Sequence, residues 1–283
     1  MWVRWFLRLL SILPLSVLHA LGGGLGRLVY RYDARYGSRL RDNARQAGFD
    51  DEAFCKEAAT HMGRSVLELG HIWTPRVGGL LAKAKVTGWD EVLAAKSAGK
   101  GVLMMTPHVG AFELLSLWIG QQAPFTAMYR PPKQAMIAEA MLQGRQKYNV
   151  KMASADVKGI RTMLRALKAG ELVGLLPDQV PNSQGEAVLV NVFGAPAWTM
   201  TLPSKLLRQT GAALVTMSAR RVDAPHRFEI DFNVVDFVPT LDMAADATRV
   251  NELMAEVILK SPSQYLWGYN RYKGVLATSE EKI

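Results

Sequence analysis

The sequence predicts an α/β fold, with a largely parallel, mixed sheet flanked by helices. From residue 89 onward, short continuous apolar runs alternate with amphipathic segments. This alternation is typical of strands that are buried on both faces and connected by crossover helices. The chain of 283 residues is long enough to bury one large core, and no internal repeat or linker divides it. We therefore expect one domain over residues 31–283, preceded by an N-terminal segment, residues 1–30, of different character.

The N-terminal segment has the composition of a membrane anchor. Residues 9–26 carry no formal charge and are flanked by arginines on both sides. Their length is at the lower end of the about 17–25 residues that span a bilayer as a helix. Pro14 and the glycines that follow it weaken a straight helix. We expect an N-terminal membrane-anchoring helix, and the sequence leaves open whether it spans the bilayer or lies in its interface.

The charge distribution indicates an anionic partner. A net charge of +9 and an isoelectric point near 9.7 favour binding to acidic proteins, phosphorylated substrates or anionic membranes. Six arginines follow the apolar segment closely: Arg27, Arg31, Arg35, Arg39, Arg41 and Arg45. Such a cluster is typical of contact with lipid headgroups, and for a spanning helix it would place the domain on the cytoplasmic side. No RNA-binding, zinc-finger or basic-zipper signature is present, so we expect no nucleic-acid partner.

The expected elements follow the apolar periodicity and the capping signals. We expect helices over 38–46, 51–73, 89–98, 110–122, 134–148, 157–169, 199–209 and 246–260. We expect strands over 101–106, 125–130, 172–176, 187–192, 213–219 and 227–235. Gly48 and Gly170 end two of these helices, and Asp50 or Asp51 caps another.

A histidine and a glutamate after the strand 101–106 form the strongest candidate for a catalytic pair. His108 follows that strand, and Glu113 falls in the first turn of the next expected helix. A carboxylate that folds back onto the imidazole would fix its tautomer and leave the far nitrogen as a general base for a hydroxyl or thiol. The competing interpretation is a surface histidine beside an unrelated glutamate. Because functional residues gather at the carboxyl ends of strands in open α/β sheets, we favour the catalytic pair.

Two further strand ends and the C-terminal segment carry candidate binding residues. Arg130 ends the next strand, and its guanidinium suits bidentate binding of phosphate or carboxylate. Asp178 follows the strand after that, where it would either orient a substrate or cap a loop. The segment 264–273 interleaves aromatic residues with Arg271 and Lys273, which suits an interface or a phosphorylated glycolipid, with a plain aromatic core as the alternative.

Several chemistries lack their signatures in this sequence. There is no Gly-x-Ser-x-Gly elbow of a serine hydrolase and no Walker loop. The single cysteine, Cys55, forms no internal disulfide and gives no zinc pattern, so we interpret it as a small buried apolar residue. We interpret His61 and His71 as core or rim residues. No metal is expected at the site.

The order of these motifs resembles the bacterial lipid A biosynthesis acyltransferases of the late, lauroyl or myristoyl type. The resemblance extends from Trp5 to Lys273 and rests on His108-x-x-x-x-Glu113, Tyr129-Arg130, Pro177-Asp178-Gln179, Val192-Phe193-Gly194-Ala195-Pro196-Ala197 and Gln264-Tyr265-x-Trp267-x-x-x-Arg271-x-Lys273. The His-x-x-x-x-Glu motif is shared with glycerol-phosphate and lysophospholipid acyltransferases, whose type of α/β fold it implies. Asn270 departs from the pattern, since the family often has a second basic residue there.

The resemblance implies an enzyme at the cytoplasmic face of the inner membrane. In the family, a fatty acyl chain moves from acyl carrier protein to a hydroxyl of a lipid A precursor. Because a thiolate is a stable leaving group, we expect neither a covalent acyl-enzyme nor a cofactor. His108 would then be the general base and Glu113 its orienting partner. Arg130, Arg271 and Lys273 would contact the phosphate or sugar-acid groups. A developing oxyanion would be bound by backbone N–H groups near Gly110.

Two alternative functions remain open from the sequence. One is the same chemistry on another membrane lipid, such as a lysophospholipid, an aminolipid or a glycolipid. The other is a catalytically silent protein that binds lipids with an inherited fold. The presence of both His108 and Glu113 speaks against the second alternative.

Overall fold

A seven-stranded sheet organises the protein. The computed structural model describes residues 2–181 and 187–275, so residues 182–186 and 276–283 of the expected domain lie outside the described part. The sheet has the order β1-β9-β8-β2-β5-β3-β4, with β1 (Lys85–Thr87), β2 (Val102–Met105), β3 (Phe125–Tyr129), β4 (Val150–Ser154), β5 (Leu172–Leu175), β8 (Ala213–Arg221) and β9 (Phe228–Val235). Neighbouring strands are parallel except β8 and β9. The predicted α/β class with a largely parallel, mixed sheet is confirmed.

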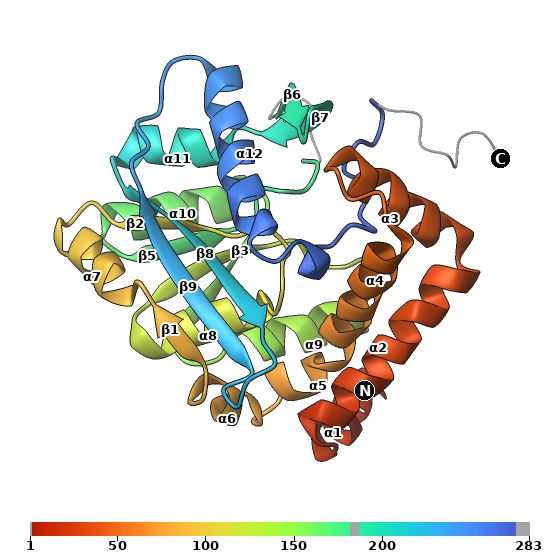
Figure 1. Ribbon diagram of the computed structural model, residues 1–283. Coiled ribbons are helices and arrows are strands. Elements are labelled where there is room, and N and C mark those ends of the chain that lie inside the picture. The colour runs from red at the N-terminus through yellow and green to blue at the C-terminus, as the bar shows by residue number, and fades with distance from the viewer. Residues whose placement is uncertain (1, 182–186, 276–283) are drawn as a thin grey trace.

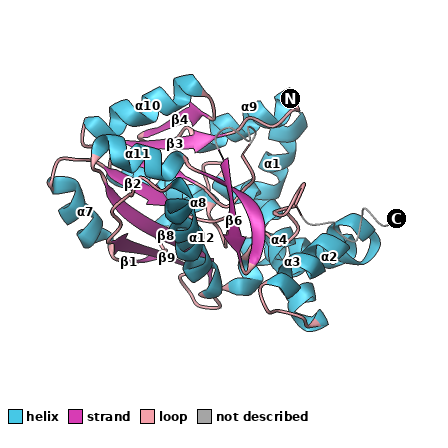
Figure 2. Cartoon of the chain, turned by 90° about the horizontal axis from the view of Figure 1, so that it is seen from above, coloured by secondary structure: helices cyan, strands magenta, loops and turns pink. Residues whose placement is uncertain are grey.

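Helices cover both faces of this sheet (Figures 1 and 2). On strand β2, Val102 and Met104 belong to one core cluster, together with α7 (Trp89–Ser97) and α8 (Glu113–Gln122). Leu103 and Met105 belong to the other, together with α10 (Val157–Lys168), α11 (Leu202–Thr210) and α12 (Met243–Leu259). Because side chains alternate across a strand, an uninterrupted apolar run supplies both cores at once.

A β-hairpin packs near the C-terminal segment. Strands β6 (Ala187–Val192) and β7 (Ala195–Met200) pair in antiparallel register. Phe193 and Gly194 join them with φ of 48° and 81°, the left-handed backbone that a tight two-residue hairpin turn requires. Strand β7 was not expected, and helix α11 consequently begins at Leu202 rather than at residue 199. The short strands β1 and β4 were also not expected.

Helices form the N-terminal part of the chain and lie beyond one end of the sheet (Figure 1). They are α1 (Trp2–Ile12), α2 (Leu15–Tyr32), α3 (Ala34–Gln46), α4 (Glu52–Leu67) and the short α5 (Leu69–Ile72) and α6 (Val77–Leu81). Pro14 separates α1 from α2, so the uncharged segment is divided between two helices. Among the described residues, no helix combines the length and the hydrophobicity needed to cross a bilayer. The remaining helix is α9 (Ala135–Arg145).

The glycines of α2 form a close helix contact rather than a weak point. A Cβ atom on Gly26 would lie 1.9 Å from the Ala59 carbonyl oxygen of α4, and one on Gly22 would lie 2.6 Å from that of Gly63. Gly63 faces Gly22 in return, so the two backbones approach closely because side chains are missing on both. Helix α2 therefore continues past residue 30 as a packed part of the fold.

Candidate active site

Three candidate residues meet at the carboxyl edge of the sheet. His108 follows β2, Asp178 follows β5 and Arg130 follows β3, and these strands are parallel neighbours in the order β2-β5-β3. The side chains of His108 and Arg130 line the same cavity. The expectation that these strand ends share one edge of the sheet is confirmed.

Asp178 holds the imidazole of His108 at two points. Its Oδ1 lies 2.8 Å from His108 Nδ1, and its Oδ2 accepts a hydrogen bond of 3.0 Å from the His108 backbone N–H. Burial raises the pKa of the Asp178 carboxyl, but the charge of His108 and these hydrogen bonds outweigh burial and hold the pKa below its usual range. An ionised carboxylate only accepts hydrogen bonds, so Nδ1 carries a proton, and in the neutral imidazole it is Nε2 that presents its lone pair.

Glu113 has different partners from the ones we expected. Its carboxylate forms a two-point ion pair with Arg145 at the end of α9 and accepts a hydrogen bond of 3.2 Å from Trp73 Nε1. Burial raises the pKa of Glu113, but Arg145 outweighs that effect and keeps the group ionised. The imidazole contact predicted for Glu113 is therefore made by Asp178. Glu113 still lines the cavity beside His108, because it begins α8.

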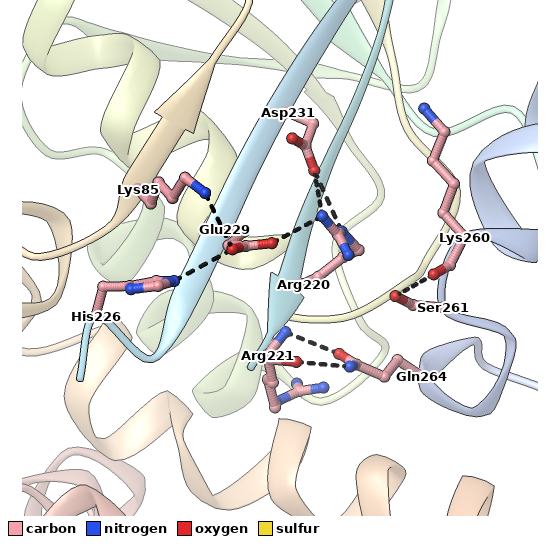
Figure 3. A network of polar contacts seen from close by, with 9 residues as sticks. All are labelled: Lys85, Arg220, Arg221, His226, Glu229, Asp231, Lys260, Ser261 and Gln264. Atoms are coloured by element: carbon pink, nitrogen blue, oxygen red, sulfur yellow. Dashed lines mark hydrogen bonds and ion pairs between the residues drawn. The ribbon is translucent and has the colours of Figure 1, made fainter. Parts of the chain in front are cut away.

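The loop that carries His108 is fixed by its neighbours in the sheet and by the C-terminal segment. Gly110 has φ of +63°, and a Cβ atom there would lie 2.1 Å from the Ala219 carbonyl oxygen of β8. The Leu266 N–H donates to the His108 carbonyl oxygen at 3.1 Å. Gln264 forms two hydrogen bonds of 2.9 Å with the backbone of Arg221 at the end of β8 (Figure 3). The position of His108 thus depends on chain segments more than 100 residues apart.

Two backbone N–H groups near Gly110 are already used by this support. Gly110 donates to the Gln264 carbonyl oxygen at 3.0 Å, and Ala111 donates to that of Ala219 at 2.7 Å. These two N–H groups are therefore not available to an oxyanion, and the contribution expected from the helix start that follows them stays a prediction. A side-chain donor does lie at the reactive nitrogen: Gln179 Nε2 is 3.3 Å from His108 Nε2.

The C-terminal basic residues lie away from the cavity. Arg271 is buried, and its guanidinium donates 2.7 Å to the Trp198 carbonyl oxygen and 2.9 Å to Thr199 Oγ1 of β7. Because these bonds hold the hairpin, the structure gives Arg271 a supporting task in place of the expected substrate contact. Lys273 is exposed and lines none of the cavities described here. Tyr265 and Trp267 are buried in an aromatic cluster, so the core interpretation of this segment holds.

A central cavity of about 250 Å³ opens at His108. Its walls are mainly apolar and include five methionines: Met128, Met141, Met152, Met200 and Met217. Thioether side chains are flexible and adapt to irregular apolar ligands. A neighbouring cavity, the α4 cavity, is lined by residues of α4 such as Met62 and Val66, and it shares His108, Phe112 and Glu113 with the central cavity. His108 thus lines two cavities.

The remaining titratable candidates are buried structural residues. Cys55 is buried, and burial raises the pKa of its thiol. His61 and His71 are buried as expected. Within residues 2–181 and 187–275, no three His, Cys, Asp or Glu side chains are grouped so that they would hold a metal ion.

The sequence interpretation missed Arg145 and Gln179. Gln179 directly follows Asp178 in the Pro-Asp-Gln motif, so the sequence did contain a signal that it lies at the site. Arg145 gave none, because an arginine in the last turn of a helix usually interacts with the helix dipole in solvent. Gly144 places its backbone against Trp73, with the indole 2.4 Å from where a Cβ would be, and this contact brings Arg145 to Glu113.

Comparison with known proteins identifies the family. The family model for bacterial lipid A biosynthesis acyltransferase matches residues 1–274. The chain is 27% identical over 283 residues to the lipid A biosynthesis lauroyltransferase of Escherichia coli, with 96% of this chain and 92% of the relative covered. It is equally similar, at 27% identity, to the palmitoleoyltransferase of the same organism, with 96% and 91% covered. A phosphatidylinositol mannoside acyltransferase of Mycobacterium tuberculosis is 25% identical over 199 residues, with 65% and 62% covered. The chain therefore belongs to the bacterial lipid A biosynthesis acyltransferase family.

Proposed function

We propose that the protein transfers a fatty acyl chain from acyl carrier protein to a hydroxyl group of a lipid A precursor. The observation that carries this proposal is the His108–Asp178 pair at the wall of a methionine-lined cavity. The imidazole supplies a base, and the cavity supplies an apolar site for an alkyl chain beside it. The family membership supplies the class of acceptor.

One proton passes through His108 in two transfers. Nε2 takes the proton of the acceptor hydroxyl while the hydroxyl oxygen attacks the thioester carbonyl carbon. The carbon–sulfur bond then breaks, and the leaving thiolate receives the proton from Nε2, which restores the neutral imidazole. Positioned base catalysis of this kind accelerates a reaction by about 10²–10⁴-fold. Asp178 stabilises the imidazolium that forms between the two transfers.

Gln179 and Arg130 complete the polar surroundings. The Gln179 amide donates toward the Nε2 lone pair, and we infer that the acceptor hydroxyl displaces it. The displaced amide is then available to the developing oxyanion. Arg130 is exposed at the cavity and forms no ion pair with another described residue, which suits it to a substrate phosphate.

The outer surface of α1 and α2 supports binding to the membrane interface. Its exposed apolar side chains are Trp5, Phe6, Leu9, Ile12, Val17, Leu21, Leu25, Leu28, Val29 and Tyr32. On α2 they follow a helical spacing opposite the buried glycines, and exposed arginines flank them. This combination is typical of an amphipathic helix that lies in the plane of an anionic membrane. We therefore propose an interfacial anchor at the cytoplasmic face of the inner membrane.

The membrane surface can be tested with a matched pair of substitutions. Leu21→Asp, at 54% exposure on α2, should weaken binding to anionic vesicles by about ten-fold, since it removes one inserted side chain. Leu259→Asp, at 52% exposure on α12, is the control and should leave vesicle binding unchanged. Equal binding of both variants would argue against an interface on α2.

The catalytic proposal is tested by thiol release. Purified protein is incubated with a long-chain acyl carrier protein thioester and a lipid A precursor, and free thiol is measured together with the product mass. Wild type should release one thiol for each acyl chain added, whereas a folded His108→Ala variant should release almost none. Near-normal turnover by that variant would refute base catalysis by His108.

A second acceptor class deserves the same assay because of one relative. The similarity to a phosphatidylinositol mannoside acyltransferase covers 65% of the chain, so a different glycolipid acceptor is the alternative proposal. Comparing the two acceptors at equal concentration discriminates them. Preferred acylation of the lipid A precursor supports the main proposal.

A further inference from the structure

One face of α10 carries a row of unpaired positive charges. Lys158, Arg161, Arg165 and Lys168 follow each other at three- and four-residue intervals, which places them on one side of the helix. All four are exposed, and none forms an ion pair with another described residue. Helix α10 contains no acidic residue. This basic row is a strong local positive field on the surface.

A third cavity opens beside the basic row. This side cavity, of about 160 Å³, is lined by Ile160 and Leu164 of α10 and by Lys205 and Gln209 of α11. Lys205 is exposed and adds a fifth positive charge at its rim. The cavity thus has a basic entrance and an apolar wall.

The side cavity leads toward the catalytic histidine. It shares four lining residues with the central cavity: Met128, Arg130, Ala155 and Met200. The central cavity in turn reaches His108. A long, narrow group that entered between α10 and α11 would pass Arg130 before it reached the imidazole.

We propose that the basic row of α10, together with Lys205, is the docking surface for the acidic carrier protein that delivers the acyl chain. This inference rests on the proposed function. The carrier's acidic surface pairs with the basic row, its phosphorylated arm runs through the side cavity with the phosphate at Lys205 or Arg130, and the thioester arrives at His108. The acyl chain continues into the methionine-lined part of the central cavity.

The position of the basic row favours a protein over a lipid surface. Helices α10 and α11 lie on the opposite side of the molecule from α1 and α2 (Figures 1 and 2). The exposed apolar side chains that would insert into a membrane gather on α1 and α2, whereas Val157 is the exposed large apolar residue that α10 contributes. Donor and membrane-embedded acceptor would thus approach from different sides, in agreement with the two cavities that His108 lines.

The test reverses two charges of the row and compares two donors. The Arg161→Glu/Arg165→Glu variant should raise KM for the acyl carrier protein thioester by about ten-fold or more, because surface charges steer association. Its KM and kcat for the corresponding acyl-pantetheine thioester should not change, since neither residue lines a cavity. The control is Arg76→Glu/Lys83→Glu, which makes the same change in net charge at exposed positions near α6. Unchanged turnover of acyl-pantetheine also reports that each variant is folded.

Each result bears on the proposal. Equal KM values for the carrier thioester in the Arg161→Glu/Arg165→Glu variant and in its control would overturn the docking surface. If the Arg161→Glu/Arg165→Glu variant instead lost vesicle binding while its KM for the carrier thioester stayed unchanged, the basic row would bind lipid, which would also overturn the proposal. A Lys158→Glu/Lys168→Glu variant should reproduce the carrier effect from the two ends of the row. Failure of wild type to use the carrier thioester would instead refute the proposed donor itself.

Discussion

Asp178→Asn tests which carboxylate orients the imidazole that we propose as the general base. Asp178 accepts from the His108 backbone N–H with one oxygen and from Nδ1 with the other. An asparagine has a single acceptor oxygen. Since the backbone N–H is always a donor, that oxygen stays with it and the amide NH₂ group faces Nδ1. The imidazole must then carry its proton on Nε2, where it can no longer take one from a hydroxyl.

The expected loss is large in kcat and small in KM. Reversing the tautomer of a catalytic histidine costs about 10⁴-fold in kcat in serine proteases, and the base contributes about 10²–10⁴-fold in general. We therefore expect a fall of about 10³-fold, equivalent to about 4 kcal/mol of transition-state stabilisation. Thiol release at saturating acyl thioester measures kcat, and the ¹⁵N shifts of the imidazole report the tautomer directly.

Glu113→Gln is the comparison that can refute this reasoning. It removes one partner of the buried ion pair with Arg145, which costs about 3–5 kcal/mol of stability because a charge is left unpaired. The main effect should thus be a lower Tm. A near-normal kcat for Asp178→Asn, combined with a 10³-fold loss for Glu113→Gln at unchanged Tm, would show that Glu113 orients the imidazole in the working enzyme.

Three other perturbations test separate parts of the fold. Gly110→Ala should lower both Tm and kcat, because its Cβ would lie 2.1 Å from a carbonyl oxygen of β8. Gly99→Ala is the control: Gly99 has φ of +81° but no atom within 4 Å of its Cβ position. This variant should lose only about 1 kcal/mol of stability and keep full activity. His61 stays neutral in the folded state because burial, and then Arg221 and Arg64, lower its pKa from 6.5 to about 3. As the pH falls below about 6.5, the unfolded state therefore binds a proton that the folded state does not bind. The folded state should lose about 2 kcal/mol of stability by pH 5 for this reason. Denaturant titration should show this slope in wild type and its absence in His61→Gln. Gly26→Ala should detach α2 and lower Tm by several degrees, while Gly24→Ala, with open space around it, should raise helix stability by about 0.5–1 kcal/mol.

The central strands were predictable because they are buried on both faces. Strands β2, β3 and β5 appear in the sequence as uninterrupted apolar runs, and their observed bounds lie within two residues of the expected ones. Strand β1 has three residues and alternates exposed with half-buried side chains, so it gives no pattern to detect. Strand β7 contains Pro196, which argues against a strand unless the strand lies at an edge.

The members of the site were predictable, but their pairing was not. Parallel strands bring their carboxyl ends to one edge, and this rule placed His108, Arg130 and Asp178 together. Proximity along the chain suggested Glu113 as the partner of His108. Helix α8 instead directs that carboxylate toward α9, where it pairs with Arg145, which lies 32 residues away in sequence. Which carboxylate reaches an imidazole depends on tertiary packing, and a single sequence contains no signal for it.

The C-terminal motif shows that a sequence motif alone does not distinguish a residue that binds substrate from one that holds the fold together. A basic residue in a segment rich in aromatics looks the same in sequence whether it binds a phosphate or a backbone carbonyl. The guanidinium of Arg271 has five fixed donors, which suit Thr199 and the Trp198 carbonyl of a hairpin as well as they suit a phosphate. Both tasks require arginine, so residue type alone cannot distinguish them. Burial does: Arg271 is 5% exposed and its guanidinium is directed to the hairpin, whereas the exposed Arg130 lines both the central and the side cavity.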